Sequence, residues 1–369
     1  MKYFILAGEK SGDLHGANLI RALHQQDKTA KILAWGGDEM QAAGGDLLIH
    51  HKDIAIMGLI GVLQNITRLK RLFKTFEVQI NDFKPDTIIF IDYGGFNLKA
   101  AKIAKLAGFH TQFYIAPKVW AWNYSRVKTI RKWIDELYVI FPFEQKLFED
   151  EGISTHYVGN PIMDELSAFK VDKNFLAENH ISKPFIALLP GSRKQELTYL
   201  LPVFKQLKET LPQYNFIIGG VKEFKNLIEK TGIQAVYDNT YSLLTASQIA
   251  IVCSGTATLE TALLGTPLVV VYKTDNLFYN LAKLLVKLKY ISLVNIILDK
   301  LAIPELLQNE VNVSKISQHI ESLFPENSIE RINQLEDFKT LKKLVGEKGA
   351  SDRAAQIIIE KAKNFSNNS

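Results

Sequence analysis

Short apolar runs rich in β-branched residues alternate along this chain with longer amphipathic stretches, and this alternation limits the fold more than any other feature. Strand-like and helix-like segments in alternation predict a mostly parallel sheet with helices on both faces. The pattern occurs twice, because a polar stretch at 160–184 separates two series. The expected strands are 3–7, 31–35, 87–92, 111–115, 137–141 and 155–158, then 185–189, 215–218, 249–253 and 267–272.

We therefore predict an α/β fold with two doubly wound domains that face a cleft, at 1–165 and 166–340. From 313 onward the chain reads as helices only, so a C-terminal helix and tail at 341–369 are expected to dock on the first domain. Doubly wound sheets bind ligands at the carboxyl ends of their strands. The expected helices are 14–23, 63–83, 98–107, 195–210, 222–230, 257–264 and 277–288.

Composition excludes several classes of protein. The chain has 369 residues, 47% hydrophobic and 22% charged, which is a globular composition large enough for two cores. A single cysteine, Cys253, excludes an internal disulfide framework and a thiolate zinc site, and no metal or cofactor is expected. The N-terminus lacks the pattern of a signal peptide, and no apolar run approaches the ~18 residues of a membrane span. We expect a cytoplasmic protein.

Positive charge is concentrated in one region. The net charge is +5, but 13 Lys or Arg and only 4 Asp or Glu lie between Arg68 and Lys132. Such a region attracts anionic lipid or nucleic acid, or forms an ordinary solvated face. The pattern by itself leaves these readings open.

Two segments of the first half follow predicted strands. The glycine-containing segment 7–17 could bring its backbone close to a ligand, or form a tight turn capped by Ser11 or Asp13. Asp92 ends an apolar strand, where a carboxylate can accept a proton from a substrate hydroxyl; a turn aspartate is the alternative. After the next strand, the segment 117–122 brings two tryptophans, which could pack in the cleft, at a lipid interface or in the core.

Two segments of the second half have the composition of anion-binding loops. Gly191, Ser192 and Arg193 precede a helix, where amides, helix dipole and guanidinium would favour a diphosphate, unless the turn is merely capped. Ser254, Gly255 and Thr256 open another helix in the same way. Glu260 lies one turn further on, where a carboxylate could take both ribose hydroxyls or stabilise the helix dipole.

In their order, these segments resemble the lipid-A-disaccharide synthase family, glycosyltransferases of the two-domain GT-B type. The resemblance runs from Phe4 to about Gln308. Gly94-Gly95 stands where the family commonly has Pro-Asp. The matching motifs are AGEKSGD at 7–13, GGDEM at 36–40, MG at 57–58, ID at 91–92, FN at 96–97, PKVWAW at 117–122, PFE at 142–144, VGNP at 158–161, LLPGSR at 188–193, SGTA at 254–257 with Glu260, Asn295, and PELLQ at 304–308.

The resemblance implies an inverting transfer between two lipid-bearing sugars. The donor would be UDP-2,3-diacylglucosamine, the acceptor 2,3-diacylglucosamine 1-phosphate, and the product a β-1,6-linked disaccharide plus UDP. Asp92 matches the family's candidate general base. The first domain would serve the acceptor and the membrane, and the second the UDP-sugar donor. The acceptor-side loop would comprise Glu9, Ser11 and Gly12, and the donor site Gly191, Ser192, Arg193, Ser254, Gly255, Thr256, Glu260, Asn295 and Gln308.

Lipid substrates imply contact with a bilayer surface. The basic-apolar stretches 68–74 and 277–298 could rest on the anionic cytoplasmic face of the inner membrane without a transmembrane anchor. A homodimer is possible, and no nucleic acid is expected as a partner. The alternatives are another enzyme of this fold that uses UDP-N-acetylglucosamine, as an epimerase or with a soluble acceptor, and a non-catalytic binder of anionic membrane or nucleic acid.

Overall fold

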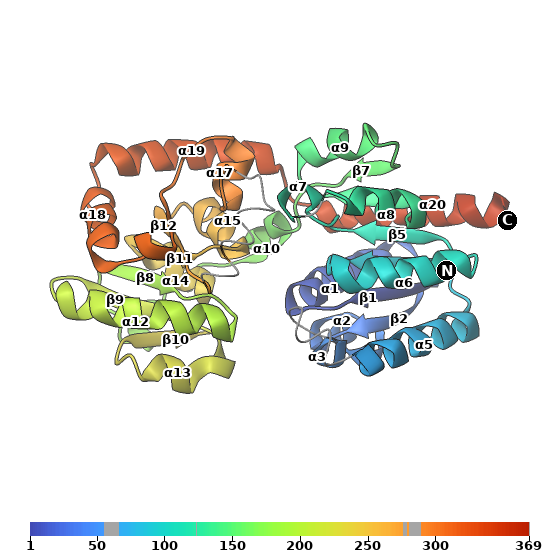
Figure 1. The fold of residues 1–369 in the computed structure, drawn as a ribbon, viewed down its shortest axis with the longest axis horizontal. Helices are drawn as coiled ribbons and strands as arrows, with labels where there is room; N and C mark the ends of the chain where they lie inside the picture. Colours follow the sequence, from blue (N-terminus) through green and yellow to red (C-terminus); the bar gives the residue numbers. More distant parts are fainter. Residues whose placement is uncertain (55–65, 123, 276–278, 280–288, 369) are drawn as a thin grey trace. The chain divides into compact units, whose positions relative to one another are not determined.

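The computed structural model describes residues 1–54, 66–122, 124–275, 279 and 289–368, and it divides the chain into two compact units. The first unit comprises Met1–Asp164 and Val345–Ser369, and the second comprises Glu165–Leu344. Each unit is built around one parallel sheet packed with helices (Figure 1). The predicted fold class, two parallel-sheet α/β domains with a helical C-terminus, is confirmed.

The first unit contains a seven-stranded sheet in the order β3-β2-β1-β4-β5-β6-β7. All its strand pairs are parallel. The central strands β1 and β4 are almost entirely buried, as expected for a sheet covered on both faces. The strands are β1 (Lys2–Ala7), β2 (Lys31–Gly36), β3 (Asp46–His50), β4 (Thr87–Ile91), β5 (Thr111–Tyr114), β6 (Glu136–Val139) and β7 (Thr155–Tyr157).

Aromatic side chains fill much of the core on one side of this sheet. The Phe76 ring meets Phe4 and Trp35 edge to face, with centroids 5.5 and 5.7 Å apart. Gln79, on the same helix as Phe76, accepts the Trp35 indole N–H at 2.7 Å, which satisfies the polar atom of this buried ring. The helices of this unit are α1 (Lys10–Gln26), α2 (Asp38–Ala42), α3 (His51–Ile54), α5 (Ile66–Phe83), α6 (Gly94–Leu106), α7 (Val119–Trp122), α8 (Arg126–Trp133), α9 (Pro142–Glu149) and α20 (Ala350–Asn368).

The last helix, α20, belongs to the first unit although it lies far away in sequence. Asp164 accepts hydrogen bonds from the amides of Ala350 and Ser351 at the start of α20, where an anion also suits the helix dipole. Further along α20, the buried Gln112 side chain donates to the Ile358 carbonyl at 3.2 Å. Helix α10 (Ile162–Ala168) spans the boundary between the units.

The second unit contains a six-stranded sheet in the order β10-β9-β8-β11-β12-β13, again with parallel pairs. Its strands are β8 (Phe185–Leu189), β9 (Asn215–Gly220), β10 (Gln234–Tyr237), β11 (Ile249–Cys253), β12 (Leu268–Tyr272) and β13 (Glu305–Leu307). Its helices are α11 (Phe175–Glu178), α12 (Lys194–Thr210), η1 (Lys222–Phe224), α13 (Lys225–Glu229), α14 (Thr240–Ala246), α15 (Thr256–Leu263), α17 (Leu293–Leu298), η2 (Gln308–Glu310), α18 (Val313–Leu323) and α19 (Ile329–Val345).

Each predicted strand is present, but β3, β10 and β13 were not predicted. All three lie at the edges of their sheets and are only partly buried, so they lack the continuous apolar run that marked the other strands. The helix expected at 277–288 lies outside the described residues, apart from 279. Among the helices that the structure describes, none has both the length and the apolar character needed to cross a membrane.

Candidate active site

The first group of predicted site residues lies where β1 and β4 end side by side. The chain leaves β1 toward one side of the sheet and β4 toward the other, which makes this the topological switch point. Asp92 and Tyr93 follow β4 with φ angles of 44° and 46°. Non-glycine residues rarely adopt this left-handed region, and such strain is often found at functional sites.

A buried amide side chain holds the backbone that carries Asp92. Asn97, in the first turns of α6, is fully buried, and its Nδ2 donates to the carbonyl oxygens of Ile91 at 3.0 Å and Asp92 at 2.8 Å. The same nitrogen lies 3.4 Å from the carbonyl oxygen of Leu6 in β1. Asn97 therefore joins the ends of both strands, a role that its place in the Phe-Asn motif did not reveal.

The first loop lies against this switch point. Glu9 is the N-cap residue of α1, and Ser11 is exposed in the first turn of the helix. Gly12 is buried against the end of β1, where an added Cβ would lie 3.2 Å from the Cβ of Ala7. A side chain on Gly8 would overlap the Tyr93 ring. The structure therefore places the first loop and the Asp92 loop together, because β1 and β4 are adjacent strands.

Asp13, in contrast, has a structural role. Its buried carboxylate accepts hydrogen bonds from the amides of Gly37 at 2.7 Å, Glu39 at 3.2 Å and Met40 at 3.1 Å. These amides begin α2, so the carboxylate satisfies helix donors that have no partner within the helix. This contact joins the motifs at 7–13 and 36–40 in the structure.

The first Trp of the Pro-Lys-Val-Trp-Ala-Trp motif is anchored by the Pro-Phe-Glu motif. Glu144 is almost fully buried and accepts the Trp120 indole N–H at 2.9 Å and the Phe141 amide at 3.1 Å. Burial raises the pKa of Glu144 despite these hydrogen bonds. Because the indole N–H of Trp120 is bonded to Glu144, the rest of the Trp120 ring is apolar surface. It lies edge to face with the ring of the partly exposed Phe143, with centroids 5.3 Å apart.

The predicted diphosphate loop after β8 is occupied by a carboxylate of its own helix. Glu196 accepts the amides of Ser192 at 2.9 Å and Arg193 at 3.1 Å, and it pairs with the Arg193 guanidinium at 3.2 Å. Gly191 has a φ of 96°, and a Cβ there would overlap the Glu196 carboxylate. The Arg193 side chain is 57% exposed, so the guanidinium remains accessible to an anion.

The loop after β11 is arranged differently. Gly255 is the N-cap residue of α15, and Gly255 and Thr256 are exposed. In the described part of the chain, no side chain accepts a hydrogen bond from the amides of 255–257. This helix start therefore presents amide donors and a positive dipole end to an anion. Ser254 is turned toward the segment before α17, because its hydroxyl donates to the Ile291 carbonyl at 3.3 Å.

The side-chain amide of Asn295 makes all its hydrogen bonds to other groups of the protein. It is fully buried, and its Nδ2 donates to the Ile303 carbonyl at 2.9 Å and to Glu305 Oε1 at 2.8 Å. Its Oδ1 accepts the amides of Ala302 at 2.8 Å and Ile303 at 3.0 Å. A side-chain amide offers two donors and two acceptor sites, and in Asn295 all of them are engaged by the protein itself. Asn295 therefore positions the surrounding backbone. Its predicted contact with the donor substrate stays a prediction.

The side chain of Gln308 also fixes a backbone segment, that of Thr274. It lies directly after β13 with a φ of 50°, and it is 7% exposed. Its amide group clasps Thr274, with the Thr274 N–H donating to Oε1 at 2.8 Å and Nε2 donating to the Thr274 carbonyl at 3.0 Å. Gln308 thereby joins the carboxyl ends of β12 and β13.

Within the second unit, the structure therefore brings the two glycine-containing loops to one sheet edge, after the neighbouring strands β8 and β11. Cys253 ends β11, but burial raises the pKa of its thiol to about 12, so it is not a thiolate nucleophile at neutral pH. No group of three His, Cys, Asp or Glu side chains suited to a metal ion occurs among the described residues.

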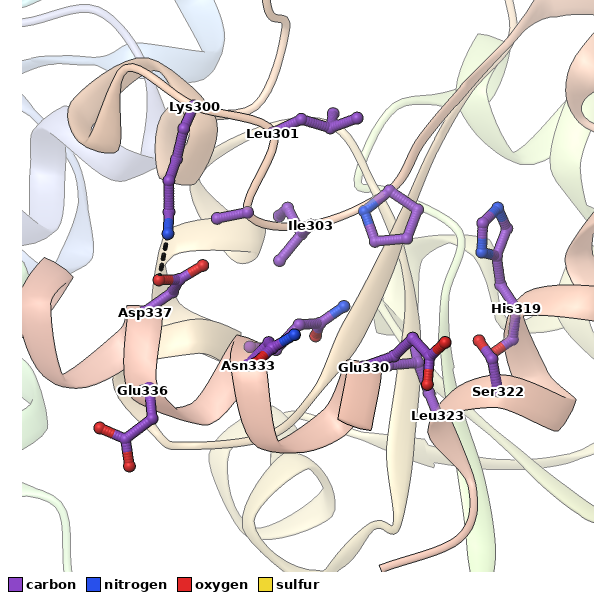
Figure 2. Close-up of a pocket in the computed structure, with 13 residues that line it drawn as sticks. Lys300, Leu301, Ile303, His319, Ser322, Leu323, Glu330, Asn333, Glu336 and Asp337 are labelled. Carbon is purple, nitrogen blue, oxygen red and sulfur yellow. Dashed lines mark hydrogen bonds and ion pairs between the residues drawn. The ribbon is translucent and has the colours of Figure 1, made fainter. Parts of the chain in front are cut away.

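A cavity of about 520 Å³ lies in the second unit, beside the segment that leads into the amino end of β13 (Figure 2). It is bordered by the segment 300–304 before β13, the end of α18 and the first half of α19, and the Lys300–Asp337 ion pair lies on one side of it. The predicted site residues do not line it. The cavity is therefore separate from the loops at the carboxyl ends.

Comparison with known proteins agrees with the motifs. The family model for lipid-A-disaccharide synthetase matches residues 3–360. A lipid-A-disaccharide synthase from Syntrophus aciditrophicus is 35% identical, covering 96% of each chain. One from Coxiella burnetii is 33% identical, covering 86% of this chain and 87% of the relative.

Solved structures share the fold at low identity. A UDP-GlcNAc 2-epimerase from Methanocaldococcus jannaschii, in complex with UDP-GlcNAc and UDP, has a TM-score of 0.67 at 14% identity over 98% of this chain and 100% of that one. The epimerase from Neisseria meningitidis bound to UDP-GlcNAc has a TM-score of 0.64 at 13% identity over 99% and 100%. The match over nearly the whole chain shows that this protein belongs to the lipid-A-disaccharide synthase family of glycosyltransferases.

Proposed function

We propose that this enzyme condenses UDP-2,3-diacylglucosamine with 2,3-diacylglucosamine 1-phosphate, giving the β-1,6-linked disaccharide 1-phosphate and UDP. The observation that carries the proposal is the family match over residues 3–360; the glycine-containing loops at the carboxyl ends of both sheets agree with it. UDP-GlcNAc in structures of the same fold supports a UDP-sugar donor. The 1–165 domain would take the acceptor, and the 166–340 domain the donor.

Asp92 is the general base of the proposed reaction. Its carboxylate takes the proton from the acceptor 6-hydroxyl as that oxygen attacks the anomeric carbon of the donor. The bond between this carbon and the diphosphate oxygen breaks, its electron pair leaves with UDP, and the configuration inverts. The half-buried position of Asp92 at the β1–β4 switch point, on backbone held by Asn97, supports this role.

The donor side stabilises the leaving diphosphate without a metal. Arg193 supplies a full positive charge, and the first amides of α15 supply dipolar donors. Glu260 takes the ribose hydroxyls. Glu9, Ser11 and Gly12 line the acceptor side of the switch point. Asn295 and Gln308 shape the donor side through the loops that they hold.

The enzyme works at the cytoplasmic face of the inner membrane, held there by charge. In α5, Leu69, Leu72 and Phe73 pack against the core of the first unit, while Arg68 and Lys70 are exposed. This arrangement favours electrostatic contact with anionic lipid over insertion. In the second proposed lipid-contact stretch, 277–298, residues 277, 278 and 280–288 lie outside the described part of the chain. A homodimer remains part of the proposal.

The reaction is tested by UDP release from UDP-2,3-diacylglucosamine with and without the acceptor. Acceptor-dependent release with formation of the disaccharide is expected, and Asp92→Asn should lower kcat by about 100-fold or more. Asp82→Asn, at an exposed position of α5, is the matched control. Acceptor-independent release would instead point to an epimerase-like activity, and near-normal turnover by Asp92→Asn would exclude Asp92 as the base.

Membrane association is tested by sedimentation with vesicles that contain anionic phospholipid. Binding is expected at low salt and should weaken as salt screens the charges. Reversal of charge at Lys70 and Lys74 should reduce binding. Negligible sedimentation at low salt would contradict the proposal.

A further inference from the structure

One guanidinium lies directly beside the loop that carries Asp92. Arg126 begins α8, and a Cβ added at Gly94 would lie 3.5 Å from its Nη1 atom. The same added Cβ would lie 3.1 Å from the Cβ and Cγ atoms of Pro117. The loop after β4, the segment after β5 and the start of α8 therefore meet at this point. Because Gly94 is two residues after Asp92, a full positive charge adjoins the loop of the proposed base.

This guanidinium is not used by the protein itself. Arg126 is half-buried, and among the described residues, Asp92 included, it has no hydrogen-bond or ion-pair partner. A guanidinium has five N–H donors and no acceptor, so one that adjoins a substrate loop without a partner is suited to an anion from outside the protein. Several other basic side chains between residues 68 and 132 form ion pairs within the protein. These pairs are Arg68–Asp53, Lys105–Asp135 and Arg131–Glu151.

The proposed acceptor carries an anion at a suitable place. In 2,3-diacylglucosamine 1-phosphate, the phosphate and the hydroxymethyl group with the attacking 6-hydroxyl are attached to the two carbons that flank the ring oxygen. An acceptor whose 6-hydroxyl approaches Asp92 therefore brings its phosphate close to the same loop. Arginine binds phosphate through two parallel N–H···O hydrogen bonds, which fix the orientation of the bound group.

We propose that Arg126 binds the 1-phosphate of the acceptor and thereby places the 6-hydroxyl at Asp92. This inference rests on the proposed function, from which it takes the acceptor. Both residues belong to the first unit, so the two ends of the acceptor are held by one domain. A site that bonds a charged substrate group discriminates strongly against an analogue without that group, because its donors are then left unpaired. Arg126 is therefore a specificity-determining residue for a phosphorylated sugar.

The test compares two acceptors with the full-length protein in neutral detergent micelles: 2,3-diacylglucosamine 1-phosphate, and 2,3-diacylglucosamine, which lacks the phosphate. Arg126→Ala should lower kcat/KM for the phosphorylated acceptor by about 10-fold to 100-fold, in the range of hydrogen bonds to a charged group. The kcat/KM for the unphosphorylated acceptor should stay close to wild type, so the preference for the phosphate is lost. The KM for the UDP-sugar donor should not change.

Lys128→Ala, at an exposed position of α8, is the matched control for the loss of one positive charge, and it should keep the preference. Arg126→Lys keeps the charge without the planar fork of donors, so it should restore part of the preference. Equilibrium binding of both acceptors without donor, measured by isothermal titration calorimetry, repeats the comparison independently of turnover. The affinity gained from the phosphate should again fall by about 10-fold to 100-fold in Arg126→Ala.

The headgroup of an anionic phospholipid offers the same phosphate chemistry. Sedimentation with anionic vesicles separates the two sources, because it reports the membrane contact without the acceptor. Arg126→Ala should sediment like wild type if Arg126 binds the acceptor phosphate. Weaker sedimentation together with an unchanged preference for the phosphorylated acceptor would assign Arg126 to the membrane and overturn the inference.

An equal loss of preference in Lys128→Ala would also overturn it, since only the general positive charge would then matter. If the wild type forms the disaccharide but Arg126→Ala keeps the preference, this inference fails alone. If the wild type forms no disaccharide, the proposed function fails, and the binding measurement decides the inference. It then fails as well if the phosphate adds no affinity that depends on Arg126.

Discussion

The two loops after β8 and β11 look alike in sequence but differ in the structure. Each has a glycine and a hydroxyl-bearing residue before a helix, and each is followed by a glutamate. In the first loop, Glu196 folds back onto the amides of Ser192 and Arg193. In the second, Glu260 lies further along α15 and does not reach back to the amides of the helix start. One helix start therefore carries an internal anion, while the other presents its amides outward.

The spacing of the acid from the N-cap residue explains this difference. Glu196 is three residues after the N-cap Arg193, which is the position from which a side chain reaches back to the N-cap amide in a capping box. Glu260 is five residues after the N-cap Gly255, too far along the helix to reach back. A Gly-Ser or Gly-Thr turn is thus not enough to predict an anion site, because the nearest acid decides whether the amides are available.

The largest effect is expected from the guanidinium of the first loop. Because Glu196 occupies the amides of the loop after β8, we expect Arg193 alone to contact the diphosphate there. Arg193→Ala should then lower kcat/KM by about 100-fold, as removal of a single donor to a developing charge does in other enzymes. Lys194→Ala, at the exposed neighbouring position, is the control. Steady-state UDP release measures both. Similar losses in the two variants would show that only the general positive charge matters.

Gly191→Ala should disturb the first loop as a whole. The residue has a φ of 96°, and the new Cβ would collide with the Glu196 carboxylate. We expect the free energy of unfolding to fall by about 1–3 kcal/mol, measured by denaturant titration. Gly95→Ala, where a Cβ meets no atom within 4 Å, should be close to neutral. Equal stability of the two variants would argue against the filled conformation of the loop.

A pair of isosteric variants should give opposite results in the two loops. Glu196→Gln weakens the capping box and should lower the free energy of unfolding by about 1 kcal/mol, with a smaller effect on UDP affinity. Glu260→Gln should reduce UDP affinity by about tenfold with little effect on stability. Thermal melting and calorimetry separate the two. If both variants changed the same quantity, the proposed difference between the loops would be wrong.

The smallest effect concerns a buried example of the same capping box. Glu144 lies three residues after the N-cap Phe141 of α9, and burial raises its pKa above 4.5. The folded protein therefore holds this proton more tightly than the unfolded chain. Stability should fall as the pH rises from about 4.5 through the raised pKa, and then level off.

Glu144→Gln removes this titration, so the stability of the wild type relative to the variant should decrease as the pH rises across that interval. Denaturant unfolding between pH 4 and 7 measures the difference. The exposed Glu149 on the same helix provides a matched Glu→Gln control. A difference that is constant with pH would contradict the assignment.

The alternation of apolar and amphipathic segments was enough to predict the fold class, because strands, turns and helix starts depend on short-range patterns. The family was predicted from the resemblance of the ordered motifs. The carboxyl-end placement of Asp92, Arg193 and Glu260 follows from that order alone, since each comes directly after a buried strand or in the helix that follows it. The edge strands β3, β10 and β13 were missed for the same reason, because partial burial leaves them without a continuous apolar run.

By itself, the sequence determined which residues lie near the sheet edges, and the tertiary structure decided which of them remain available to a ligand. Asp13 is used by the amides of α2, Asn295 by the 302–305 segment, and Glu196 by its own loop. Tyr241 on α14 lies 3.4 Å from Glu165 Oε2 on α10. Local patterns place a side chain on an element, but its hydrogen-bond partners come from distant segments that only packing brings together.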